Sequence, residues 1–119
     1  MTISKGFAAE TAAARFLASQ GCSVIARNHH CQEGEVDIVC RDGDMLVFCE
    51  VKQRNAGVES ALQSVSRRKQ QKLVAAALHF LSHHPEYDGL PTRFDVLAVT
   101  PAGEHWRVYH LPDAFRPED

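Results

Sequence analysis

The apolar residues of this chain follow two spacings, one typical of helices and one typical of strands. Residues 4–20 carry small and apolar side chains at 3.6-residue spacing, and Gly21 follows as a stop signal. Residues 66–83 repeat the pattern, with Ser66 as a candidate N-cap and Pro85 after the last turn. Both segments are predicted to be amphipathic helices. The apolar stripe of the first is formed by Phe7, Ala9, Ala13, Ala14, Phe16 and Leu17.

Five shorter runs are rich in β-branched and aromatic residues and are predicted to be strands. They cover residues 23–28, 35–41, 45–53, 93–99 and 106–111. The turn Asp42-Gly43-Asp44 joins the second run to the third in a hairpin, and Pro101-Ala102-Gly103 joins the fourth to the fifth. The predicted order is therefore αβββαββ, an α/β fold. Residues 57–65 have weak periodicity and are expected to form a mobile loop.

The composition favours a single globular domain over residues 1–119. The chain has 45% hydrophobic and 24% charged residues, and a chain of this length buries enough surface for one core. Its N-terminus has no apolar segment of signal-peptide length, and no stretch approaches the roughly 20 apolar residues of a membrane span. We therefore expect a soluble cytoplasmic protein that does not enter a membrane.

The formal net charge of −2 gives no general attraction to a polyanion. The positive charges are nevertheless concentrated, because the stretch RRKQQK at residues 67–72 places four of them at the start of the second predicted helix. Such a cluster is also typical of a solvated helix face.

An acid and a base interrupt the apolar pattern of the third predicted strand. Side chains alternate between the faces of a strand, so Glu50 and Lys52 emerge on the same face. A hairpin loop of two residues, 42–43, or of four residues, 42–45, adds Asp37 to that face, and the longer loop puts Asp37 directly opposite Glu50. A loop with an odd number of residues would separate them unless a bulge restored the alternation.

The pattern of the first predicted helix contains one further acid, because Glu10 falls inside its apolar stripe. Two carboxylates about 4 Å apart repel each other by about 4 kcal/mol at an effective dielectric constant of about 20. Lys52, a raised carboxyl pKa or a bound divalent cation would each offset this repulsion. The hard oxygen ligands of Glu10, Asp37 and Glu50 suit Mg²⁺ or Mn²⁺ best. The alternative is an exposed edge pair beside a glutamate whose carboxylate reaches water.

The cysteines and histidines give weaker signals. Four cysteines without a CxxC pair favour free buried thiols, with zinc and disulfides as alternatives. The run His29-His30-Cys31 and the pair His79 and His83 each lack a full set of zinc ligands, so surface or loop histidines are the alternative.

Asp37, followed after a hairpin turn by Glu50-Val51-Lys52, resembles the D…(D/E)xK signature of the PD-(D/E)xK nuclease superfamily. Val36 stands where that motif has a proline. A longer resemblance, to the YraN family of uncharacterised bacterial proteins, extends over nearly the whole chain. It rests on the stretches GFAAETAAARFLASQG, ARN, GEVDIV, VFCEVKQR, RRKQQKL and RFDVLAV.

The resemblance implies a restriction-endonuclease-like core, with a mixed β-sheet flanked by helices. It implies that Asp37 and Glu50 bind Mg²⁺ or Mn²⁺, that Lys52 is the motif lysine, and that Glu10 corresponds to a first-helix glutamate of archaeal Holliday-junction resolvases. The expected partner is nucleic acid, DNA in particular, and a homodimer is compatible with the resemblance. Phosphate contacts are expected from Arg54, Arg67, Arg68, Lys69 and Lys72.

These expectations favour a metal-dependent nuclease, an endonuclease or an exonuclease, that hydrolyses phosphodiester bonds in branched or single-stranded DNA. The alternative is a nucleic-acid-binding or adaptor module that keeps the nuclease fold without turnover. A third interpretation is a structural or assembly protein whose acidic cluster is a solvated edge.

Overall fold

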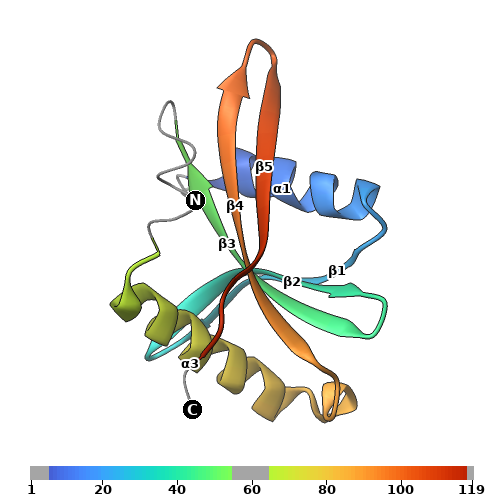
Figure 1. Cartoon of the computed structure of the whole chain (residues 1–119), viewed down its shortest axis with the longest axis vertical. Coiled ribbons are helices and arrows are strands. Elements are labelled where there is room, and N and C mark those ends of the chain that lie inside the picture. The colour runs from blue at the N-terminus through green and yellow to red at the C-terminus, as the bar shows by residue number, and fades with distance from the viewer. Residues whose placement is uncertain (1–5, 55–64, 118–119) are drawn as a thin grey trace, which may run out of the picture.

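The computed structural model describes residues 6–54 and 65–117, in which a five-stranded sheet lies between two long helices (Figure 1). The elements follow the predicted order αβββαββ, with one short 3₁₀ helix added, and are consistent with a restriction-endonuclease-like fold. They are α1 (Phe7–Ser19), β1 (Ser23–Cys31), β2 (Gly34–Asp42), β3 (Met45–Gln53), α3 (Arg67–His83), η1 (Pro85–Tyr87), β4 (Thr92–Ala102) and β5 (His105–Phe115).

The sheet has the strand order β1-β2-β3-β4-β5. Strands β3 and β4 run parallel, whereas the other neighbouring pairs are antiparallel, so the sheet is mixed. A parallel pair requires a crossover connection, and α3 lies in the crossover between β3 and β4. The expected mixed sheet flanked by helices is thus confirmed.

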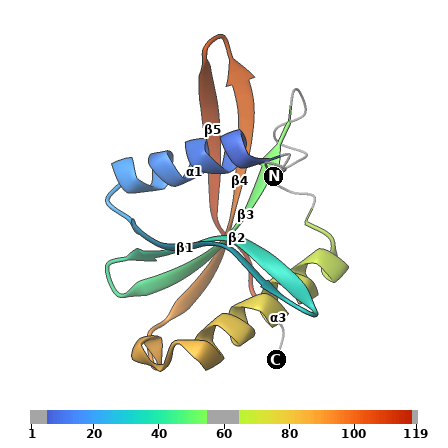
Figure 2. The same cartoon turned by 180° about the vertical axis from the view of Figure 1, so that it is seen from behind.

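The two helices cover opposite faces of the sheet (Figure 2). Strand β3 contributes to both cores because its side chains alternate between the faces: Val47 and Cys49 pack with α1, whereas Leu46 and Phe48 pack with α3. We call these two sets of buried residues the α1-side core and the α3-side core. They place the end of β3 within reach of both helices.

The hairpin between β2 and β3 closes on a two-residue turn, Gly43-Asp44, flanked by the pair Asp42 and Met45. This turn differs from both loops considered above, but its register is that of the four-residue loop. Gly43 has a φ of 60°, a conformation that glycine adopts without steric cost. The turn between β4 and β5 also differs from the expected one, because Ala102 pairs with His105 and only two residues lie between them.

Helix α3 begins at the predicted position. Ser66 caps α3 as expected, since its hydroxyl oxygen accepts a hydrogen bond from the Lys69 N–H at 3.1 Å. The buried face of α1 includes Ala9, Ala13 and Leu17, but Phe7 was wrongly assigned to it. The Phe7 side chain is 49% exposed, because it lies at the margin of the stripe in the first turn of the helix.

Two sequence-based expectations fall wholly or partly outside the described residues. The expected mobile loop covers residues 57–65, of which only Val65 is described, and the predicted start of the first helix at residues 4 and 5 is likewise not described. Within the described ranges, neither helix is long and apolar enough to cross a membrane.

The turn between β1 and β2 packs tightly against α3 at Gly34. A side chain there would overlap the backbone carbonyl group of Lys72, which cannot move without shifting the helix. We therefore expect Gly34→Ala to lower the free energy of unfolding by about 1–3 kcal/mol, the usual cost of overpacking. Chemical denaturation measures this change. Glu33→Ala, at an exposed neighbouring position, is the matched control. A Gly34→Ala protein within about 0.5 kcal/mol of wild type would contradict the contact.

Candidate functional site

The antiparallel ladder between β2 and β3 ends at the pair Ile38 and Cys49. Beyond this pair the start of β2 and the end of β3 diverge (Figure 1). Counted from the pair that closes the turn, the next residues to exchange backbone hydrogen bonds would be Val36 and Val51. Instead, the Val51 N–H donates to Asp37 Oδ2 at 2.7 Å. A carboxylate thus replaces a backbone carbonyl at the point where the sheet opens.

The backbone beside Asp37 is also irregular on the β1 side. The β1 residues that flank Asn28 pair with the β2 residues that flank Asp37, so these two residues lie at the same level of the sheet. Asn28 has a φ of 55°, in the left-handed region that asparagine tolerates better than most residues. Regular strand geometry is therefore interrupted beside Asp37 on both sides.

Glu50 lies opposite Asp37 in the register of the hairpin. Both side chains are buried, with exposed fractions of 7% for Asp37 and 4% for Glu50, and their carboxyl groups share a hydrogen bond. We call Asp37, Glu50 and the Val51 N–H the fork. The structure thus brings together the two acids of the sequence motif.

Two lysines flank the Glu50 carboxylate. Lys69, in the first turn of α3, places its Nζ 3.1 Å from Glu50 Oε2. Burial alone would lower the pKa of Lys69, but attraction and hydrogen bonding to Glu50 raise it. Lys52 is half-buried two residues after Glu50, and burial lowers the pKa of its ammonium group, with attraction to Glu50 opposing part of this effect. Lys69 is therefore the closer counter-ion.

Glu10 approaches the fork from the opposite face of the sheet, because it belongs to α1 whereas Lys69 belongs to α3. Its side chain is buried, and its Oε1 atom makes no hydrogen bond with any residue that the structure describes. Arg27 of β1 places its Nη2 3.8 Å from that oxygen. Glu10 is close enough to Asp37 for their charges to interact.

Burial is the main cause of the raised pKa of Asp37. Loss of hydration, repulsion from Glu50 and the hydrogen bond shared with Glu50 raise the pKa of Asp37 from 3.8 to about 8. The hydrogen bond from the Val51 N–H opposes this shift, whereas repulsion from Glu10 adds to it. The fork therefore keeps a proton near neutral pH, which offsets the repulsion between its two acids.

Asp95 of β4 shows how the same protein compensates an acid that it only buries. Its carboxylate has no exposed surface and accepts hydrogen bonds from Arg93 at 2.8 and 3.0 Å, from His110 at 2.7 Å and from the Asp113 N–H at 2.9 Å. Burial would raise the pKa of Asp95, but these donors together lower it. Asp95 is saturated with donors, and Asp37 is not.

The fork fits a magnesium or manganese ion only in part. Across residues 6–54 and 65–117, no three His, Cys, Asp or Glu side chains are arranged to hold a metal ion, so Glu10, Asp37 and Glu50 do not form a preassembled set. Mg²⁺, however, is usually held by one or two carboxylates together with water and substrate phosphates. The paired acids fit that chemistry, and so does Glu10 Oε1, which accepts no hydrogen bond from the described residues.

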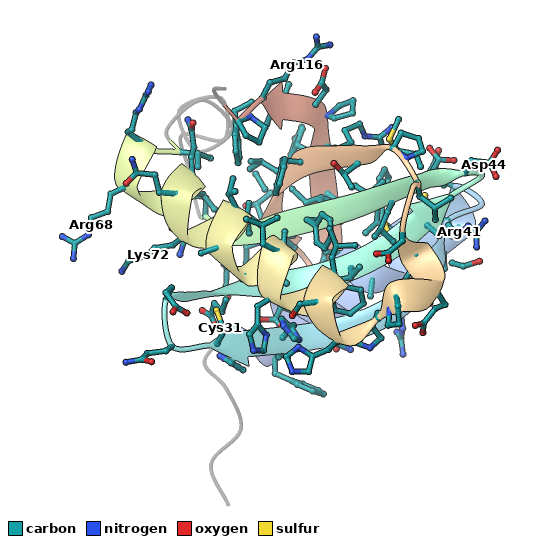
Figure 3. All side chains as sticks on the ribbon, turned by 90° about the horizontal axis from the view of Figure 1, so that it is seen from below. Cys31, Arg41, Asp44, Arg68, Lys72 and Arg116 are labelled. Atoms are coloured by element: carbon teal, nitrogen blue, oxygen red, sulfur yellow. The ribbon has the colours of Figure 1, made fainter. Side chains whose placement is uncertain are left out.

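The basic residues expected to contact phosphates differ in their exposure. Arg68 and Lys72 are exposed and project outward from α3 (Figure 3). Arg67 and Arg54 are also exposed, the latter directly after β3. Lys69 is instead half-buried against Glu50, so its position differs from that of a residue on a solvated helix face.

The zinc alternatives gain no support from the geometry of the described residues. His29 Nε2 and His79 Nδ1 lie 2.9 Å apart, which is a hydrogen-bond distance, and the rings of His79 and His83 are adjacent. No third ligand completes a site within the described ranges. All four cysteines are free, which confirms the favoured interpretation, although only Cys40 and Cys49 are fully buried.

Three contributors to the site escaped sequence analysis. Arg27 was not singled out, although it lies in the ARN stretch and its Nη2 is 3.8 Å from Glu10 Oε1. The pairing of Lys69 with Glu50 was foreseeable only from the Ser66 cap, which fixes Lys69 in the first turn of α3. The Asp37 contact with the Val51 N–H had no signal in the sequence, because it depends on where the ladder ends.

Comparisons with known proteins place these residues in a family. The sequence profile described as "Uncharacterised protein family UPF0102" matches residues 9–99. A UPF0102 protein of Alcanivorax borkumensis is 43% identical over 112 residues, which are 92% of this chain and 90% of the relative. UPF0102 proteins of Saccharophagus degradans and Chloroflexus aurantiacus are 45% and 44% identical, over 85% and 82% of this chain and 86% and 80% of their own lengths. These matches confirm the resemblance to the YraN family.

The raised pKa of Asp37 predicts how stability depends on pH. The folded protein holds the Asp37 proton up to a pH of about 8, whereas the unfolded chain releases it near 3.8. The resulting stabilisation is complete below pH 3.8 and is lost as the pH rises through 8. Relative to Asp37→Asn, the free energy of unfolding of wild type should therefore fall by up to about 1.4 kcal/mol per pH unit as the pH rises between these limits. Chemical denaturation of both proteins across this pH range measures the fall. The same pH dependence in both proteins would contradict the prediction.

Proposed function

This chain belongs to the uncharacterised protein family UPF0102, and we propose that it is a metal-dependent nuclease that hydrolyses phosphodiester bonds in DNA. The observation that supports the proposal is the fork, where two buried carboxyl groups from neighbouring strands share a hydrogen bond where the sheet opens. Burying two carboxyl groups side by side costs stability, so packing alone does not explain the pair. Asp95 in the same sheet differs from this pair, because donors from Arg93, His110 and the Asp113 N–H surround its carboxylate.

Mg²⁺ or Mn²⁺ is the cofactor that suits this donor set. Asp37 and Glu50 would bind the ion directly, and Glu10 would hold a coordinated water molecule from the other side of the sheet. Once bound, the ion would neutralise the excess charge of the fork and act as a Lewis acid toward a phosphate oxygen.

Lys52 is the residue best placed to handle the proton of an attacking water molecule. It follows Glu50 by two positions in β3 and is half-buried, which lowers the pKa of its ammonium group. A lysine with a lowered pKa is a better proton acceptor, and in its charged form it stabilises negative charge at phosphorus. Lys52 therefore serves to orient or deprotonate water and to stabilise the developing charge.

Exposed basic residues near the fork would hold the substrate backbone. Arg54, Arg68 and Lys72 contact phosphates in this proposal, and Arg67 extends the same surface along α3. Phosphate contacts position a nucleic acid without reading its sequence. Recognition by the shape of branched or single-stranded DNA is therefore expected, in preference to recognition of a base sequence.

The ion pair between Lys69 and Glu50 favours a second candidate function. Lys69 Nζ, at 3.1 Å from Glu50 Oε2, supplies positive charge to the fork without a metal ion. In a nucleic-acid-binding or adaptor module, this pair would stabilise the fork permanently, and binding would depend on salt without any cleavage. In the nuclease, a cation competes with Lys69 for Glu50. The two functions thus differ in whether the fork takes up a divalent ion.

Metal binding at the fork is tested by calorimetric titration of Mn²⁺ at pH 7.5. Wild type is expected to bind at one saturable site, Asp37→Asn to lose that binding, and Lys69→Met to bind a few-fold more tightly because the competing ammonium group is gone. Asp44→Asn, at an exposed position in the hairpin turn, is the matched control and should bind as wild type does. Equal binding by wild type and Asp37→Asn would contradict a metal at the fork.

Cleavage is tested with labelled duplex, single-stranded, flapped and four-way-junction DNA in Mg²⁺ and in Mn²⁺. On any substrate that wild type cuts, Glu50→Gln and Lys52→Met should lower the rate by about 100-fold or more, because each removes a group needed in the transition state.

The Asp44→Asn protein is again the control, and circular dichroism confirms that each variant is folded. Full activity in both site variants would exclude the proposed mechanism. Salt-dependent DNA binding by a wild-type protein that cuts none of these substrates would favour the adaptor module.

A further inference from the structure

A groove of about 510 Å³ lies on the other side of α1 from its buried face, next to the turn that joins β4 to β5. Figure 2 shows α1 crossing these two strands, with the end of their hairpin projecting beyond the helix. The helix contributes Phe7, Thr11 and Arg15 to the groove, and the hairpin contributes Glu104, His105 and Trp106. Its volume is within the range of small-molecule sites.

Two aromatic side chains from distant parts of the sequence line this groove. Phe7 is 49% exposed, although α1 has an apolar face on which a phenylalanine would be buried. Trp106 is half-buried, packs against the α1-side core, and also lines the groove. An exposed aromatic surface in a concave site is typical of ligand binding, since its flat faces stack on other planar groups.

One guanidinium group connects the groove to the fork. Arg27 lies over the Phe7 ring, with its Cζ 5.2 Å from the ring centroid, and its Nη2 donates to Thr11 Oγ1 at 3.1 Å. The same Nη2 lies 3.8 Å from Glu10 Oε1. Phe7 is thus connected through Arg27 to Glu10, whose charge interacts with that of Asp37.

The chemistry of the groove fits an unpaired nucleobase attached to a phosphate. Every base has a flat face that stacks on Phe or Trp, and a cation beside the aromatic surface attracts the phosphate. Arg15 is exposed in the groove and offers that charge, whereas Glu104 adds one acid at the hairpin end. Bases in a duplex have their faces covered by their neighbours, so a duplex cannot use this surface without unstacking.

We propose that this groove binds an unpaired base of single-stranded DNA, stacked on Phe7 or Trp106, with Arg15 at its phosphate. The inference rests on the proposed nuclease function, because it assigns that site a substrate with an unpaired segment. The unpaired strand passes from the groove, beside Arg27 and Glu10, to the fork. Duplex DNA without such a segment is then a poor ligand.

Trp106 makes this proposal measurable, since it is the only tryptophan in the chain. A single-stranded oligothymidylate of about 12 nucleotides is titrated into the full-length protein in EDTA, and tryptophan fluorescence is recorded. The expected result is saturable quenching that weakens as salt rises. Phe7→Ala and, separately, Arg15→Ala should weaken binding, Phe7→Ala by roughly ten-fold or more. No quenching, or equal quenching by a duplex of the same length, would overturn the proposal.

Two controls separate this proposal from the nuclease function. Tyr109→Ala removes an exposed aromatic residue of β5 that does not line the groove, and it should bind as wild type does. The EDTA in the titration is the second control, because it removes divalent metal and with it any cleavage. Quenching that survives Tyr109→Ala but not Phe7→Ala supports the groove whatever the outcome of the cleavage assays. Loss of quenching in the Tyr109→Ala protein, or its persistence in both groove variants, would contradict the assignment.

Discussion

The hydrogen bond from the Val51 N–H to Asp37 Oδ2 is the interaction on which the rest of the site depends. Because a side chain occupies that N–H, the ladder between β2 and β3 ends and the two strands are free to diverge. The same contact holds Asp37 beside Glu50. The opening is reached by Lys69 of α3 from one face and by Glu10 of α1 from the other. One backbone contact therefore brings residues from four elements together.

The comparison between Asp37 and Asp95 separates a structural acid from a candidate functional one. Both are buried in strands of the same sheet, yet their pKa values shift in opposite directions. Asp95 is surrounded by donors from Arg93, His110 and a backbone N–H, and so remains charged at low cost. Asp37 has one such donor and two acidic neighbours. A bound cation would offset the repulsion between the acids at the fork.

The sequence was most informative where hydrophobic periodicity decides the structure. The element order, the two faces of β3 and the cap at Ser66 follow from the sequence pattern. The placement of Asp37 opposite Glu50 depends on the length of the hairpin loop, which the sequence left open between two values. Strands at the sheet margins were predicted too short, as β1 extends to Cys31 and β5 to Phe115. Edge strands are partly exposed, so backbone pairing sustains them where the apolar pattern stops. The exposure of Phe7 and the contacts of Arg27 depend on tertiary packing, which spacing along one helix does not encode.

The central claim is that a divalent cation occupies the fork, and anomalous X-ray diffraction from crystals grown with Mn²⁺ tests it most directly. The account predicts a peak about 2 Å from oxygen atoms of both Asp37 and Glu50, with the Lys69 ammonium group moved away from Glu50. The claim would be contradicted if the fork held no Mn²⁺ at saturating concentration and Lys69 were still paired with Glu50. The fork would then be a permanent ion pair.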